Sequence, residues 1–294
     1  MKQRNLNLAA LLALSFLLTG CNLLPTTRHL PVPKAPVITQ TVAPEALVDQ
    51  LNQRWNAVSA LTATVEIQAS EIKSNQGVAK DFPSCRGYIL MRKPDMLRVV
   101  GTYFGVKIFD MAGDGKNFTL YIPSKSKAIE GSYTVGKKSA NELENLRPDF
   151  FYDALVVRGL DSDDEYMVTA DTDTVEDAKK KHLLLVPEYI LSVMRPKEGS
   201  HELAPVRVVT FHREDLLPYE QDLYDSKGNL VTHVMYSNYA DFGSAKFPSR
   251  VVIKRPLEGI QIVMTVERVV ENIKLRDDQF QVELQDGTQI QKLD

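Results

Sequence analysis

Histidines, acidic residues and hydroxyl groups most often carry out chemistry, but their spacing in this sequence fits no catalytic motif. The five histidines are scattered, and no two have the spacing of zinc ligands. The segment 113–116 lacks the spacing of a phosphate-binding loop, and no Gly-x-Ser-x-Gly motif occurs. Acidic and basic groups stand next to each other at 212–215, where we predict a turn. We therefore expect no catalytic residues, no metal site and no cofactor.

Acidic residues gather between 161 and 173 and could supply oxygen ligands to Ca²⁺. They are Asp161, Asp163, Asp164, Glu165, Asp171 and Asp173. The segment lacks the glycine and the terminal glutamate of an EF-hand loop. We interpret it as a solvated acidic loop.

The start of the chain has the pattern of an export signal. Lys2 and Arg4 precede an uncharged run over residues 5–18 that is rich in Leu and Ala. This run is shorter than the roughly 20 apolar residues that a membrane-spanning helix needs. The pattern predicts a signal peptide over residues 1–20.

The signal peptide ends in Leu-Thr-Gly-Cys at residues 18–21, which resembles the lipobox of bacterial lipoproteins. The resemblance implies cleavage after Gly20 and a lipid on Cys21, whose thiol is a better nucleophile than a hydroxyl. An ordinary secretory signal with a chance cysteine is the alternative. Because Asn22 rather than Asp follows the cysteine, we expect an outer-membrane anchor with the folded domain facing the periplasm.

A tether and one folded domain are expected after the cleavage site. Residues 21–42 contain four prolines among small and polar residues, which is typical of an extended linker. The remaining residues, 43–294, are predicted to form one domain. The formal net charge is −3, and loss of Lys2 and Arg4 with the signal peptide makes it −5, which argues against a nucleic-acid-binding protein. Since Cys85 is the second of only two cysteines, we expect no internal disulfide.

The hydrophobic pattern predicts one helix followed by many strands. Apolar residues recur at helical spacing from Pro44 to Val58, with Trp55 among them, and at alternate positions from Leu61 onward. A second helix is predicted over residues 139–158. The predicted strands span 61–70, 86–93, 96–103, 106–111, 117–122, 182–186, 206–213, 219–225, 230–237, 249–255, 260–270 and 280–284.

This order of elements predicts a mainly β fold with few helices. We expect an incomplete antiparallel β-barrel, which is a strongly curved sheet of about eleven strands. The inner face of such a sheet must be covered, so we expect the helices to form a lid over an apolar cavity.

Several segments are similar to ones that recur in the LolA/LolB superfamily of periplasmic lipoprotein carriers and outer-membrane lipoprotein receptors. They are the strand ending in Lys93-Pro94, the Leu97-Arg98 pair, the turn at 114–116 and a closing strand at 280–284. The resemblance spans about residues 44–293, although the segment 160–181 makes this chain longer than the receptor. It implies an incomplete barrel with a helical lid over an apolar cavity.

The resemblance also implies a protruding apolar loop that touches acyl chains or membrane. Tyr103 and Phe104 occupy the matching place, with Gly101 and Gly105 on either side. The alternative is a turn whose aromatic rings pack on a neighbouring strand. Further candidates for the cavity or its lid are Trp55, Phe150 and Phe151, although Trp55 also suits ordinary core packing.

Two classes of function remain open, besides a lipid-anchored hydrolase for which no nucleophile–base pair is found. The first is a non-enzymatic lipoprotein that binds acyl chains of lipids or lipoproteins, for transport or insertion into the membrane. The second is a periplasmic sensor or structural lipoprotein that binds another envelope protein. A deep apolar cavity would favour the first, and exposed apolar residues on the lid would favour the second.

Overall fold

The computed structural model describes residues 39–73, 78–133, 144, 146–177, 182–197, 199–243 and 245–293. The predicted signal peptide, Gly20, Cys21, Asn22 and most of the tether lie outside these residues. The chain divides into two compact units. The larger comprises Pro36–Asp173 and Val186–Asp294, and the smaller comprises Met1–Ala35 and Thr174–Leu185.

Two α-helices, two short 3-10 helices and fifteen strands are formed by the described residues. The helices are α2 (Pro44–Ala57), α3 (Pro148–Leu155), η2 (Pro123–Lys125) and η4 (Asp277–Phe280). The first strands are β1 (Ala60–Lys73), β2 (Val78–Asp81), β3 (Cys85–Arg92), β4 (Met96–Tyr103), β5 (Val106–Gly113), β6 (Asn117–Ile122) and β7 (Lys127–Ser132). The others are β8 (Glu165–Asp177), β9 (His182–Pro196), β10 (Leu203–His212), β11 (Pro218–Tyr224), β12 (Leu230–Phe242), β13 (Ala245–Arg255), β14 (Ile260–Glu271) and β15 (Gln289–Lys292).

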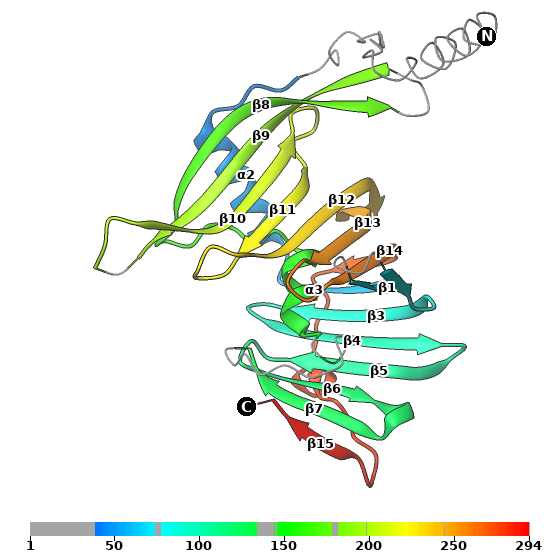
Figure 1. The fold of residues 1–294 in the computed structure, drawn as a ribbon. Helices are drawn as coiled ribbons and strands as arrows, with labels where there is room; N and C mark the ends of the chain where they lie inside the picture. The colour runs from blue at the N-terminus through cyan, green and yellow to red at the C-terminus, as the bar shows by residue number, and fades with distance from the viewer. Residues whose placement is uncertain are drawn as a thin grey trace, which may run out of the picture. The chain divides into compact units, whose positions relative to one another are not determined.

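All the described strands belong to one sheet (Figure 1). Their order is β15-β7-β6-β5-β4-β3-β1-β14-β13-β12-β11-β10-β9-β8, and β2 pairs with β1. The first strand, β1, joins the early and late parts of the chain because it pairs with both β3 and β14. The path ends at β15 and β8, so the sheet is not closed. The predicted mainly β, open sheet is confirmed, with more strands than the eleven expected.

Each α-helix packs on a different part of the sheet. The short α3 contacts β4, β5 and β13, and its Phe151 and Leu155 join the core between them. The longer α2 packs Leu47 and Leu51 into a second core with Leu191 of β9 and residues of β10. The two helices therefore pack against separate parts of the sheet.

The first helix begins where the sequence predicts, but the second is shorter than expected. Residues 134–143 and 145, which contain part of the predicted helix 139–158, lie outside the described residues. Arg147 has φ −125° and ψ 151°, because the ring of Pro148 disfavours the helical conformation in the residue before it. The helix therefore begins at Pro148, and it ends at Leu155 because Val156 is extended.

The strand predicted at 280–284 is wrong. Phe280 ends η4, and the residues after it are irregular up to β15. An alternating pattern forms a strand only where a partner strand is free, and the edge of β7 is already paired in parallel with β15. Phe280 is buried, whereas Leu284 is exposed. The C-terminal strand of this sheet is therefore β15.

The sequence did not indicate β2, β7, β8 or β15. The acidic segment is a loop only in part, because Glu165 begins β8 and Asp171 and Asp173 lie on that strand. Both of these aspartates are exposed, so a strand with few buried side chains gave no alternating signal.

A buried ion pair holds the register of β4 and β5. The carboxylate of Asp110 is fully buried and accepts two hydrogen bonds from Arg98, at 2.9 and 2.8 Å. Lys107 donates a third at 2.6 Å. Arg98 also donates to the carbonyl oxygen of Gln279 and thereby joins the C-terminal segment to β4. The pair raises the pKa of Arg98 above its ordinary value, chiefly through the hydrogen bonds to Asp110.

Loss of this pair should destabilise the protein strongly. Arg98→Met leaves a buried carboxylate with Lys107 alone, and we expect the free energy of unfolding to fall by about 3–5 kcal/mol. Arg86→Met is the matched control, because Arg86 and Glu267 form an exposed pair, for which we expect a change within about 1 kcal/mol. Urea unfolding measures both, and similar losses in the two variants would contradict the role given to Asp110.

Candidate functional site

An apolar cleft of about 560 Å³ lies in the larger unit, against the core that α3 covers. Its volume falls within the range of about 300–1,000 Å³ that is usual for small-molecule sites. The lining comes from β1 to β6, β14, the segment before α3 and α3 itself. Its apolar members are Ile67, Ala69, Phe82, Pro83, Cys85, Tyr103, Ile108, Phe109, Met111, Leu120, Ile122, Leu146, Phe151 and Ile262.

A bulge in β5 places two adjacent side chains in the cleft. Pairing between β4 and β5 shifts register after Gly101, which lies opposite Phe109, while Thr102 lies opposite Lys107. Ile108 is the extra residue, and both Ile108 and Phe109 line the cleft. Regular alternation would have sent one of them to the opposite face.

Gly101 leaves room for the aromatic ring of Phe109. A Cβ at this position would lie 2.1 Å from the Phe109 ring, which no real contact allows. The sequence suggested that Gly101 eases the turn next to it, but the glycine lies inside β4. The absence of a side chain at Gly101 lets the Phe109 ring pack directly over the backbone of β4.

Charged groups stand at the edge of the cleft. Glu144 is buried and pairs with Lys125 at 3.0 Å and with Lys127 at 2.6 Å. Lys80 is exposed, and its ammonium lies 4.8 Å from the centre of the Phe82 ring. The cleft therefore combines an apolar interior with an edge that carries ammonium groups.

The hairpin between β4 and β5 ends in an exposed apolar tip, formed by Tyr103, Phe104 and Val106. Phe104 is 90% exposed, and Tyr103 is 46% exposed with its ring 4.6 Å from that of Phe104. Positive φ angles at Phe104 (47°) and Gly105 (79°) make the turn tight. Phe104 therefore does not pack into the core, as the alternative interpretation of this turn required.

The hairpin tip adjoins the apolar cleft. Tyr103 and Cys85 line the cleft, and both also line a shallower hollow of about 440 Å³ that includes Phe104 and Gly105. The hollow also contains Glu66 and Arg86, whose neighbours Ile67 and Cys85 line the cleft, so most of it lies on the other face of the sheet. The tip borders the cleft through Tyr103, whose ring contacts that of Phe104.

The other candidate aromatic residues do not share one cavity. Phe151 is buried and lines the cleft. Phe150 is buried elsewhere, with its ring centre 3.5 Å from the guanidinium carbon of Arg255. The lining of the cleft includes neither Phe150 nor Trp55.

Trp55 lies at the end of α2, beside a separate apolar pocket of about 280 Å³. The ammonium group of Lys93 lies 3.5 Å from the centre of the Trp55 ring and donates a hydrogen bond to the carbonyl oxygen of Trp55. Partial burial, together with the nearby charge of Arg158, lowers the pKa of Lys93 to about 8. Trp55 thus links the end of α2 to Lys93 after β3. It does not line the cleft and so would not contact a ligand bound there.

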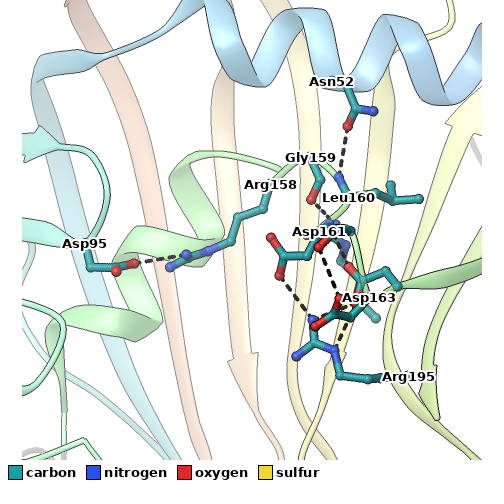
Figure 2. A network of polar contacts seen from close by, with 11 residues as sticks. Asn52, Asp95, Arg158, Gly159, Leu160, Asp161, Asp163 and Arg195 are labelled. Atoms are coloured by element: carbon teal, nitrogen blue, oxygen red, sulfur yellow. Dashed lines mark hydrogen bonds and ion pairs between the residues drawn. The ribbon is translucent and has the colours of Figure 1, made fainter.

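Two of the acidic residues near 161, Asp161 and Asp164, pair with an arginine (Figure 2). Arg195 pairs with Asp161 at 3.1 Å and with Asp164 at 2.6 Å. The side chain of Asn52 accepts a hydrogen bond from the backbone of Leu160, which ties α2 to the same segment. The loop residues therefore act as a structural connection rather than as a ready set of calcium ligands.

One group of side chains in the described part of the chain has the geometry to hold a metal ion. Ligand atoms of Glu220, Asp222 and His233 lie within 4.8 Å of one another on β11 and β12. His233 Nδ1 already lies 2.7 Å from Asp222, and this hydrogen bond raises the pKa of His233. The charge of Lys254, opposite His233 on β13, opposes a cation there. Sequence reasoning missed the group because its members come together only through strand pairing.

Cys85 is buried and free, as the sequence suggested for a structural residue. Burial raises the pKa of its thiol to about 11, so the thiolate needed for nucleophilic chemistry is scarce at neutral pH. The lipobox residues Gly20 and Cys21 lie outside the described residues. Within those residues, no helix combines the length and the apolar character needed to cross a bilayer.

Comparisons with known proteins find similarity in structure alone. No protein-family model matches the sequence, and no curated protein matches it. A DUF1329 family protein from Desulfovibrio piger is 17% identical with a TM-score of 0.50, covering 81% of this chain and 96% of its own. A LolA superfamily protein from Nitrosomonas europaea is 13% identical with a TM-score of 0.49, covering 82% and 99%.

The DUF1329 family protein, with a TM-score of 0.50, has a fold similar to that of this chain. A third similar structure is a domain assigned as an outer membrane lipoprotein-sorting protein from Vibrio parahaemolyticus, 13% identical with a TM-score of 0.48, covering 80% of this chain and 94% of its own. A protein of the LolA superfamily, which the sequence resembles, is thus among the similar structures. At such low identity, function must be argued from the cleft and the hairpin tip.

Proposed function

We propose that this protein is a lipid-anchored envelope lipoprotein that binds acyl chains of lipids or lipoproteins in the apolar cleft, for transport or insertion into a membrane. The observation that carries the proposal is the position of Tyr103, which lines the cleft and whose ring contacts the exposed ring of Phe104. The tip would enter the bilayer or touch the cargo, and an acyl chain would pass along Tyr103 into the cleft, with α3 as part of its cover. The proposal contains no catalytic step.

The energetics of burial support this assignment. Each methylene taken out of water contributes about 0.8 kcal/mol, so about ten methylenes in the cleft would contribute roughly 8 kcal/mol before the entropic cost of binding. A net gain of about 8 kcal/mol would correspond to micromolar affinity. About ten methylenes alone therefore bind more weakly than that once the entropic cost is subtracted, and a carrier can release such a chain. The ammonium group of Lys80 at the edge suits the carboxylate or phosphate at the head of such a ligand, whereas that of Lys125 is already paired with Glu144.

Binding to another envelope protein is the competing function. The same exposed tip favours it, because Phe104 is apolar and almost fully exposed. The cleft favours acyl chains, since a docking surface for a protein does not need an interior of about 560 Å³. Variants of the cleft and of the tip separate the two functions.

Narrowing the cleft should weaken lipid binding without unfolding the protein. Ala69 is half-buried and lines the cleft, so Ala69→Phe should place a ring in space that the ligand would use. We expect the affinity for a fluorescent fatty acid to fall about tenfold or more, with little change in melting temperature. Ala204→Phe, at a half-buried position outside the cleft, is the control. Equal binding by both variants would refute the proposed ligand site.

A charge on the tip should weaken membrane contact while leaving the fold intact. Phe104→Glu changes an exposed side chain, so the melting temperature should stay nearly constant while binding to phospholipid vesicles falls. Ile273→Glu is the control. Ile273 is an apolar residue that is 40% exposed, and it follows the C-terminal end of β14, away from the β4–β5 hairpin tip. Vesicle sedimentation and circular dichroism measure the two effects. Unchanged vesicle binding by Phe104→Glu, with loss of binding to an envelope protein, would favour the competing function.

The anchor at the outer membrane is proposed from the lipobox and Asn22. Cys21→Ala should abolish labelling of the protein by an alkyne fatty acid fed to the producing bacterium, since no thiol remains to accept the lipid. Cys85→Ala should keep the label, because the thiol of Cys85 is buried. Labelling of Cys21→Ala at the wild-type level would contradict the anchor.

A further inference from the structure

Three side chains that can bind a metal ion converge on two neighbouring strands, β11 and β12 (Figure 1). Asp222 lies directly opposite His233 in the pairing of these strands. Glu220 lies two residues before Asp222 and so on the same face of β11. Directly opposite and diagonal neighbours are the side chains that contact one another on a sheet face. The strand pairing therefore places one imidazole beside two carboxylates.

The group lies on the sheet face opposite the apolar core. On β12, Val234 and Tyr236 are buried in the core, whereas His233 alternates with them and is half-buried. The side chains of Asp222 and His233 are each 21% exposed and that of Glu220 is 37% exposed, so ions in solution reach all three. The apolar cleft is lined by core residues, and a ligand bound there would not contact this group.

The donor atoms of the group lie near the separations that a metal ion requires. Nδ1 of His233 lies 2.7 Å from Oδ1 of Asp222 and 3.9 Å from Oε1 of Glu220. Ligand atoms of all three residues lie within 4.8 Å of one another. In a tetrahedral zinc site, bonds of about 2.0–2.2 Å place two donor atoms about 3.3 Å apart. Small side-chain rotations would therefore bring the three donor atoms to one ion.

The charges around the group also suit a cation. The carboxylates of Asp222 and Glu188 act on Glu220, and the ammonium group of Lys254 opposes them. With a neutral His233, these three carboxylates and one ammonium leave two negative charges, which one divalent ion balances. The hydrogen bond between His233 and Asp222 is no obstacle, because a metal ion takes the place of the proton that the two atoms share.

We propose that Glu220, Asp222 and His233 form a binding site for a divalent transition-metal ion of the zinc type. An imidazole ligand suits Zn²⁺, whereas Ca²⁺ and Mg²⁺ prefer sites made of oxygen atoms alone. Three protein ligands leave a coordination position open for water. The bound ion cross-links β11 to β12 on the face away from the core.

Lys254 limits the affinity of this site. It lies opposite His233 on β13, and its positive charge acts against that of a protonated His233. The same repulsion acts on a bound cation. Lys254→Gln should therefore strengthen metal binding severalfold, a result that a general loss of structure would not produce.

Titration of the purified full-length chain with ZnCl₂ tests the proposal, in detergent and without a histidine tag. Isothermal calorimetry should show saturable binding of Zn²⁺, with Ca²⁺ and Mg²⁺ binding at least about tenfold more weakly. Co²⁺ takes the same ligands as Zn²⁺, so its visible absorption should change on binding and return to that of the free ion when Zn²⁺ displaces it.

Two variants and two controls locate the binding. His233→Gln removes the imidazole, and Asp222→Asn removes a carboxylate without adding bulk. Each should weaken binding of Zn²⁺ about tenfold or more. His201→Gln is the matched control, because His201 is an exposed histidine outside the group, and it should bind Zn²⁺ as the wild type does. Ala69→Phe should also bind normally, so failure of the acyl cleft would not count as failure of this site.

Saturable binding of Zn²⁺ that His233→Gln weakens and Lys254→Gln strengthens supports the site. Equal binding by the wild type and His233→Gln would overturn it, as would absence of saturable Zn²⁺ binding at millimolar concentration. Either result would leave His233 and Asp222 as a hydrogen-bonded pair that serves the fold alone. Should His233→Gln fail to fold by circular dichroism, Lys254→Gln decides, because stronger binding supports the site and equal or weaker binding overturns it.

Discussion

The structure depends on one constraint: the sheet has a wider apolar face than the short helix α3 can cover. The nine neighbouring strands from β7 to β12 span about 38 Å at the usual spacing of about 4.8 Å. The eight residues of α3 span only about 12 Å. The helix therefore buries Phe151 and Leu155 over the middle of the face and leaves apolar surface beside them. An uncovered stretch of such a face either fills with its own side chains or remains as a cleft, and here the cleft remains between β1, β5 and α3.

Charged residues have opposite roles at two places in the same sheet. Asp110 is fully buried and receives three charge-assisted hydrogen bonds, so it fixes the pairing of β4 with β5. Around Arg207 and Asp149, buried polar atoms remain without partners among the described residues. The first arrangement is satisfied and serves the fold. The second leaves buried atoms unpaired, which costs the folded state about 1–3 kcal/mol for each such atom.

The sequence predicted the fold well where patterns are local and poorly where they depend on partners. Alternation identified β3, β4 and β6 almost to the residue, and the apolar spacing with Pro44 identified α2. The strand at 280–284 was wrong because alternation does not reveal whether an edge is free, and β8 was missed because its side chains are exposed. Tyr103 and Phe104 could be named in advance because the resemblance to the LolA/LolB superfamily implies an apolar loop at their place. Glu220, Asp222 and His233 could not be named as one group, since only the pairing of β11 with β12 brings them together.

The register of one hairpin links the exposed tip to the interior of the cleft. Phe104 and Gly105 form a two-residue turn with positive φ angles, which fixes how β4 pairs with β5. The bulge that follows places Ile108 and Phe109 in the cleft, and Gly101 makes room for the Phe109 ring. A slip of one residue would turn Phe109 and Met111 away from the cleft and would expose the carboxylate of Asp110 to the apolar face. The turn therefore presents an aromatic ring to solvent and, through the same backbone geometry, determines which side chains form the wall that an acyl chain would meet.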